Sequence, residues 1–203
     1  DEMEMKILSP EGVDIAAVNL KSSGSSTGFR ALLTDEAAIG MSSRPIQDDE
    51  AEEFRRLGVE DMTTPTHERV LALDGLVLIV SRNNPIDALS LDDIADIYAG
   101  DITNWSELGG PDAPINVYTR EAESGTFGVF DTTVLRPRGV DVTAGARVYS
   151  SNDALSDDVA IDPNGIGYVG IANVRSAKSL SIQTECGLIA TPDPFGVKTE
   201  EYP

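Results

Sequence analysis

Residues 115–130, INVYTREAESGTFGVF, join a strand pattern, a polar loop and the start of a helix. The alternation in INVYTR predicts a strand, and SGTFGVF predicts a helix that begins at the Ser-Gly-Thr turn. Amide groups at a helix start lack partners and carry partial positive charge, which suits an anion. Arg120, at the strand end, adds a planar guanidinium that can bind an oxyanion in a bidentate way. We therefore predict an anion-binding loop within a mixed α/β fold.

Two further loops share this design. GSSTG at 24–28 runs into a predicted short helix, and MSSRP at 41–45 follows a small buried strand predicted over AAIGM. Hydroxyl groups add neutral donors, and glycine lets an oxyanion approach the backbone closely. Each loop alone has an ordinary explanation, since Ser-Gly-Thr turns cap helices and Arg120 could pair with a neighbouring glutamate. Three such loops together favour one shared anion site.

The composition excludes several classes of function. The net charge is −20, with 15 Lys and Arg against 35 Asp and Glu, which argues against binding nucleic acid or anionic membranes. His67 is the only histidine and Cys186 the only cysteine, so the chain has too few of these residues for a histidine-based catalytic triad or a zinc site. No nucleotide-binding P-loop motif occurs. We expect no metal, no cofactor and no enzymatic activity; a phosphatase is the weakest of three alternatives.

The remaining pattern is strand, loop and helix repeated many times, without a linker. Asp74 lies within an apolar run, where it either makes a structural bend or reaches the ligand cleft. Near the N-terminus we predict a hairpin or a pair of adjacent strands over 2–23, a helix over 48–58 capped by Asp48 or Asp49, and two strands within 68–85. Ser90 begins a predicted helix over 90–100, with Asp93 at the capping-box position and Gly100 at its end. Further helices are predicted over 103–110 and over 151–159, the latter capped by Ser151 or Asn152, and strands over 166–171 and 179–184.

These stretches together resemble the phosphate-binding proteins of high-affinity phosphate ABC transporters, which have the type II periplasmic-binding-protein fold. The resemblance covers about residues 18–203. The C-terminal DPFGVKTEEYP is similar to a subgroup fused to an outer-membrane-protein-A-like, peptidoglycan-anchoring domain. The matching stretches are GSSTGFRALL, AAIGMSSRPI, ALDGLVLIVSRNNP, LSLDDIADIYAGDITNWSELGGPDAPINVYTREAESGTF and IGYVGIANVRSAKSL.

The resemblance implies which residues bind the anion. Ser43 occupies a position where several members carry an acidic residue that accepts a phosphate proton, so this chain departs from the pattern for strict phosphate specificity. Asp74 would lie near the cleft. The implied phosphate-binding residues are Ser25, Ser26, Ser42, Ser43, Arg44, Asp74, Arg120, Ser124, Gly125 and Thr126.

The resemblance also implies two α/β lobes joined by two crossing hinge segments. We expect one lobe from 1–80 with 170–203, and the other from 81–169. The family's first strand and ligand loop are expected to be absent here, which would leave an open sheet edge able to pair with another copy.

The implied function is extracytoplasmic, in the periplasm or cell envelope: capture of inorganic phosphate, or a similar oxyanion, for an ABC permease. The alternative is a sensor or interaction module of the same fold in an envelope-anchored protein. Flanking sequence would distinguish the two, because a peptidoglycan-binding continuation favours the module.

Overall fold

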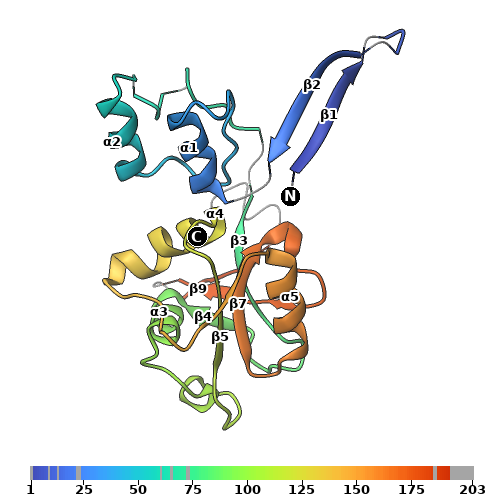
Figure 1. Cartoon of the computed structure of the whole chain (residues 1–203). Coiled ribbons are helices and arrows are strands. Elements are labelled where there is room, and N and C mark those ends of the chain that lie inside the picture. The colour runs from blue at the N-terminus through green and yellow to red at the C-terminus, as the bar shows by residue number, and fades with distance from the viewer. Residues whose placement is uncertain are drawn as a thin grey trace.

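The computed structural model is a mixed α/β protein (Figure 1). It describes residues 2–8, 10–12, 14–21, 24–59, 61–64, 66–71, 74–184 and 187–192. Cys186 lies outside this part of the chain.

A five-stranded mixed sheet forms the centre, in the order β6-β5-β7-β3-β8. β7 pairs antiparallel with β3 on one side and parallel with β5 on the other. β3 and β7 are almost wholly buried, as expected for apolar strands covered on both faces. The strands span Leu76–Val80 (β3), Asn116–Arg120 (β5), Arg147–Tyr149 (β6), Gly165–Gly170 (β7) and Lys178–Ser179 (β8).

Helices pack against the central sheet, and three further strands form a small second sheet. α3, Leu91–Ala99, begins at Ser90 with the predicted capping box and ends at Gly100 in the left-handed conformation. α5, Asn152–Ile161, begins at Ser151 and packs against β7. The second sheet contains β4 (Ala88–Ser90), β9 (Ser181–Gln183) and β10 (Ile189–Ala190).

The predicted 115–130 unit is confirmed. β5 leads into α4, Gly125–Phe130, which continues through a π-helical turn over Asp131–Leu135 and a 3-10 turn over Arg136–Arg138. A separate 3-10 turn spans Trp105–Leu108. The Phe130 ring stacks on Tyr168 of β7 at a centroid distance of 4.1 Å, which fixes the helix to the sheet.

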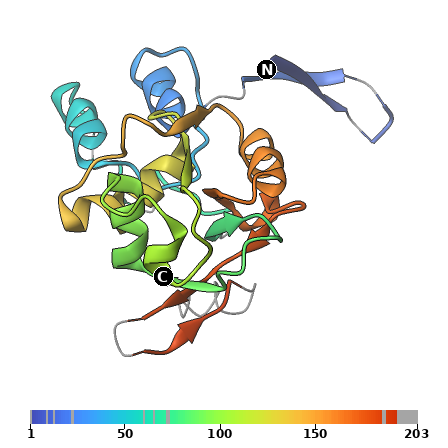
Figure 2. The same ribbon diagram turned by 90° about the horizontal axis from the view of Figure 1, so that it is seen from below.

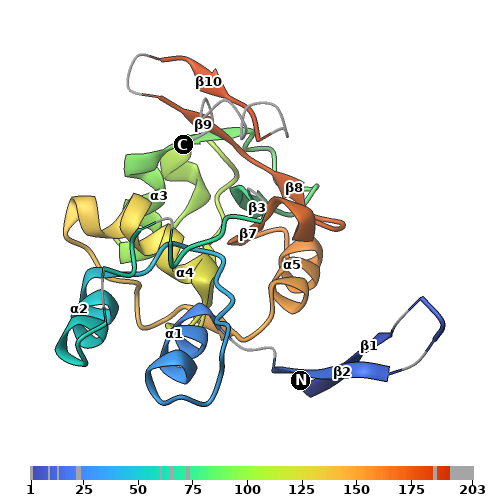
Figure 3. The same ribbon diagram turned by 90° about the horizontal axis from the view of Figure 1, so that it is seen from above.

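The N-terminal part stands apart from this core. β1 (Glu2–Leu8) and β2 (Asp14–Lys21) form the predicted antiparallel hairpin, which projects away from the body in all three views (Figures 1, 2 and 3). α1 (Ser25–Leu33) and α2 (Asp48–Arg56) lie on the α4 side of the molecule (Figure 3).

Three local predictions are wrong. Residues 37–46 form an irregular loop with bends rather than a buried strand, and Ile39 is 83% exposed. Among the described residues within 68–85 only β3 is a strand, and Leu71 is 94% exposed. An apolar stretch becomes a strand only where a neighbour pairs with its backbone, and no described strand lies beside either stretch. Gln47, not Asp48 or Asp49, is the cap of α2, because Glu50 bonds back to the Gln47 amide.

The strand pairings cross the predicted lobe division. β3 pairs with β7, and β9 pairs in parallel with β4. Because these pairs join strands from both predicted lobes, the lobe boundaries after residues 80 and 169 remain a prediction. None of the described helices has the length and apolarity needed to cross a membrane.

Candidate functional site

The first two predicted loops meet at the start of α1. Ser25 is the first residue of this helix, with Gly24 as its cap, and Ser25 is only 5% exposed. Its Oγ accepts a hydrogen bond from the Ser43 amide at 3.1 Å and lies 3.3 Å from the Ser43 Oγ. Two hydroxyl groups from separate loops therefore form one small polar surface.

The third loop closes on this pair. A Cβ atom added to Gly125 would lie 2.1 Å from the Ser25 Oγ and 2.2 Å from the Ser43 Oγ. A Cβ atom on Gly24 would lie 2.1 Å from the backbone oxygen of Glu123. Both glycines are thus required by close approach, and the three predicted loops form one cluster.

The start of α4 supplies the backbone donors of the cluster. Ser124 caps this helix, its Oγ accepting from the Phe127 amide at 3.3 Å. Ser124 and Gly125 are buried, and Thr126 is partly exposed. The amides of Gly125 and Thr126, which precede the capped Phe127 amide, have no partner within the helix and can bind an anion that reaches this turn.

Arg120 is held beside α4 by neutral acceptors. Its guanidinium donates to the backbone oxygens of Tyr149 (3.1 Å) and Ser150 (2.9 Å), and its Nη1 donates to the Asn152 Oδ1. Burial lowers the pKa of Arg120, which nevertheless stays protonated at neutral pH. None of the ion pairs among the described residues involves this guanidinium, so its charge remains available to an anionic ligand.

Asn152 is a site residue that sequence reasoning missed. We predicted Asn152 only as a possible helix cap, and Ser151 is the residue that caps the helix. The Asn152 amide instead bridges two predicted ligands, accepting from Arg120 and donating to the Thr126 Oγ1 across a long 3.5 Å contact. The signal was weak, since asparagine at a helix start is common for capping alone.

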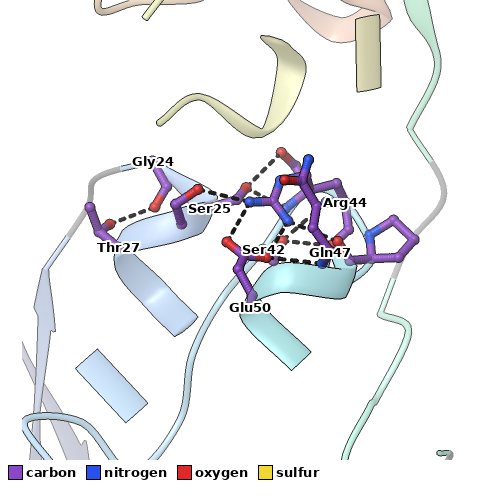
Figure 4. A network of polar contacts seen from close by, with 10 residues as sticks. Gly24, Ser25, Thr27, Ser42, Arg44, Gln47 and Glu50 are labelled. Carbon is purple, nitrogen blue, oxygen red and sulfur yellow. Dashed lines mark hydrogen bonds and ion pairs between the residues drawn. The ribbon is translucent and has the colours of Figure 1, made fainter. Parts of the chain in front are cut away.

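Arg44 and its neighbours form a separate ion-pair cluster (Figure 4). The Arg44 guanidinium pairs in a bidentate way with Glu50, at 2.7 and 2.8 Å, and also donates to the Ser26 Oγ at 2.8 Å. Ser42 holds the Arg44 backbone, donating to its oxygen at 2.6 Å and accepting from its amide at 3.2 Å. The predicted ligands Ser26, Ser42 and Arg44 thus bond to one another and to Glu50.

Glu50 is ionised in this cluster. Burial alone would raise the pKa of its carboxyl, but hydrogen bonds from Arg44 and from the Gln47 amide, together with the Arg44 charge, lower it below the ordinary value. The ion pair is neutral overall and largely buried, with side-chain exposures of 5% for Arg44 and 15% for Glu50. It fixes α2 to the loop that carries Ser43.

Asp74 lies at the end of β7 rather than among the three loops. Its Oδ1 accepts from the Gly75 amide at 3.0 Å, as the structural-bend alternative expects. A Cβ atom on Gly170 would lie 2.6 Å from the Asp74 Oδ2. No described contact joins Asp74 to Ser25, Ser43 or Gly125.

The arrangement is suited to binding rather than to catalysis. The cluster offers hydroxyl groups, helix-start amides and one guanidinium, all of which can donate hydrogen bonds to an anion. His67 is exposed and contacts Thr64 and Thr66, outside the cluster. Among the described residues no group of histidine, cysteine and acidic side chains could hold a metal ion.

Sequence comparisons identify relatives of the chain. The sequence model of a family described as "PBP superfamily domain" matches residues 10–200. Protein SphX of Synechococcus elongatus is 28% identical over 192 residues, which cover 89% of this chain and 54% of SphX. The phosphate-binding protein PstS of Borreliella burgdorferi is 28% identical over 172 residues, covering 81% and 58% respectively. The chain therefore spans little more than half the length of these relatives.

Solved structures share the fold. A protein from Clostridium perfringens, described as a phosphate ABC transporter substrate-binding protein with bound phosphate, superposes with a TM-score of 0.73 at 33% identity. That match covers 88% of this chain and 67% of the other. An ABC-type phosphate transport receptor from Vibrio cholerae gives a TM-score of 0.69 at 31% identity, covering 89% and 69%. The predicted type II periplasmic-binding-protein fold is confirmed.

Proposed function

This chain belongs to the PBP superfamily domain family, and from that premise we propose that it binds inorganic phosphate or a related tetrahedral oxyanion. The observation that carries the proposal is the convergence of Ser25, Ser43 and Gly125 from three separate loops, beside the start of α4. Arg120 supplies the full positive charge. Neutral donors and one guanidinium would bind the ligand there. Such a site can bind an anion even though the net charge of the chain is −20.

We further propose a role in uptake. Related proteins are named as phosphate-binding proteins and as a phosphate transport receptor. By analogy this chain would work outside the cytoplasm, capture phosphate between its two lobes and present it to an ABC permease. Lobe closure over the anion would remove water from it and strengthen each charge-assisted bond.

Phosphate and sulfate should be poorly distinguished if Ser43 faces the ligand. A hydroxyl group can donate to a fully ionised oxyanion, whereas a carboxylate would repel it. The carboxylate that contacts this loop region, that of Glu50, is already bonded to Arg44 by both of its oxygens. The cluster therefore offers no free carboxylate from that side to accept a phosphate proton.

Two finer proposals concern partners. The module would be fused to an envelope-anchoring domain if the C-terminal resemblance extends beyond this chain. Copies would also pair through the hairpin, because β1 and β2 pair only with each other among the described strands. Sedimentation over a range of protein concentrations tests pairing, and a constant monomer mass would refute it.

Isothermal titration with phosphate, sulfate and arsenate tests the central proposal. We expect heat with phosphate, and a loss of about 10-fold or more in affinity for Arg120→Ala, because a hydrogen bond to a charged group contributes about 1.5–3 kcal/mol. Arg56→Ala is the matched control, since Arg56 is 71% exposed and pairs only loosely with Glu52. Unchanged phosphate affinity in Arg120→Ala would refute the site, and absence of heat with all three anions would refute the function.

A further inference from the structure

A second hollow lies at the opposite end of β5 from Arg120. The strands β5 and β6 run parallel, with Tyr118 beside Arg147 and Arg120 beside Tyr149. Arg147 therefore marks the far end of the shared edge. A cavity of about 220 Å³ opens there, lined by α3, the segment that follows it, β5 and the loop before β6. We propose that this cavity is a binding site for a short-chain carboxylate.

The cavity is lined by both aliphatic and polar residues. Ile97, Ile102, Ile115 and Val117 line it with aliphatic carbon, and Ile97 is fully buried. The rest of the lining is glycine and polar residues: Gly100, Thr103, Asn116, Thr143, Gly145 and Arg147. Such a mixed lining suits a ligand with one charged end and a short hydrocarbon tail better than a small inorganic anion.

Arg147 has no acidic partner among the described residues. Six arginines form ion pairs with aspartate or glutamate, whereas Arg147, like Arg120, has no carboxylate of the described residues within 4 Å of its guanidinium. Arg147 instead donates to the Tyr118 Oη at 3.0 Å, and its guanidinium lies 5.3 Å from the centre of the Tyr118 ring. These partners are neutral, so the positive charge remains available to a ligand.

Asp162 holds the Tyr118 hydroxyl group in place. This hydroxyl group donates to the Asp162 Oδ2 at 2.8 Å, and Asn116 donates to the same oxygen at 2.8 Å. With its proton directed to Asp162, the Tyr118 oxygen presents a lone pair to Arg147. Asp162 therefore orients the guanidinium through Tyr118 without pairing with it directly.

The volume sets the size of the ligand. A 150 Å³ apolar cavity in another protein binds benzene, so about 220 Å³ has room for roughly eight non-hydrogen atoms. Hexanoate, with a carboxylate and a five-carbon tail, has that size. Each methylene group placed against the isoleucines should raise affinity about fourfold.

Isothermal titration with acetate, butyrate, hexanoate and uncharged hexanamide tests the proposal. We expect affinity to rise with chain length and hexanamide to bind at least about 10-fold more weakly than hexanoate. Arg147→Met should abolish the preference for the carboxylate, and Arg147→Lys should restore part of it. Gly145→Leu should block binding by filling the cavity, since a Cβ there meets only the Thr143 Oγ1 at 3.9 Å.

Thermal unfolding shows whether each variant is folded, and Arg56→Ala is the control for loss of a surface arginine. Binding that is independent of chain length, or unchanged in both Arg147→Met and Gly145→Leu, would overturn the proposal, as would the absence of hexanoate binding. Phosphate titrations of the same variants keep the two sites distinct. Unmodified protein that binds hexanoate but none of phosphate, sulfate and arsenate would refute the proposed function alone.

Discussion

The hydroxyl oxygens of Ser25 and Ser43 lie 3.3 Å apart, although 18 residues separate them in the chain. The Ser43 amide also donates to the Ser25 Oγ, so the second loop is bonded directly to the start of α1. Gly125 faces both oxygens from a third segment. This three-way contact turns separate polar loops into a single surface of donors.

Gly125→Ala tests this contact. The added methyl group would lie 2.1 Å from the Ser25 Oγ and 2.2 Å from the Ser43 Oγ, so both hydroxyl groups must turn away or the loops must move apart. We expect phosphate affinity to fall by about 10-fold or more, through loss of at least one bond to the charged ligand. Titration calorimetry measures the change. Gly145→Ala is the control, because its Cβ would make only an ordinary contact; equal affinities of the two variants would contradict the assigned geometry.

Asn152→Ala tests a positioning role. Asn152 bridges Arg120 and Thr126, so its loss should free the guanidinium without removing the charge. We expect a smaller loss of phosphate affinity than in Arg120→Ala, about 3- to 10-fold, as for one neutral hydrogen bond. Asn173→Ala removes a comparable surface amide, bonded to Asp153, and should leave binding unchanged. A loss as large as that of Arg120→Ala would instead make Asn152 a direct ligand.

Local patterns predicted the parts of this fold that rest on local chemistry. The capping box of Ser90 and Asp93, the terminating Gly100 and the turn before α4 are set by neighbouring residues. The exposed stretches around Ile39 and Leu71 have the composition of strands, but strand formation depends on a pairing partner distant in sequence. Composition therefore indicated which stretches could form strands, and the presence or absence of a pairing strand determined which of them did.

In the candidate site, too, the features set by neighbouring residues could be predicted, and the pairing of side chains from different elements could not. Ser25, Ser43 and Gly125 could be predicted because serine and glycine beside a helix start have a recognisable pattern. The capture of Arg44 by Glu50 could not, since six residues separate them and many acids compete for each arginine in this chain. The sequence showed that Arg44 was available, and only the packing of α2 showed its partner.

Glu50→Gln should destabilise the protein. The change leaves the Arg44 guanidinium largely buried without a carboxylate, and loss of one member of such a pair costs about 3–5 kcal/mol. Urea unfolding gives the free energy. Glu52→Gln is the matched control: its pair with Arg55 is about half exposed on both sides and should contribute at most about 1 kcal/mol. Equal effects of the two substitutions would show that the Arg44 cluster does not hold α2.

The stability of the Arg44 cluster should also depend on pH. The pKa of Glu50 is lower in the folded protein than its ordinary value, despite burial, because of its bonds to Arg44 and the Gln47 amide. A lowered carboxyl pKa adds stability above the pKa of the unfolded chain, near 4.3, and this contribution is lost as pH falls through the folded pKa. Glu50→Gln has no such proton to take up.

Unfolding free energies of wild type and Glu50→Gln, measured between pH 6 and pH 3, check this dependence. The difference should be constant above about pH 5 and shrink below about pH 4.3, at no more than about 1.4 kcal/mol per pH unit for one proton. Repulsion from the net charge of −20 acts on both proteins, differing by a single charge, so it nearly cancels in the difference. Parallel curves down to pH 3 would show that the Glu50 carboxylate gains nothing from folding, and would exclude the ion pair as the contact that anchors α2.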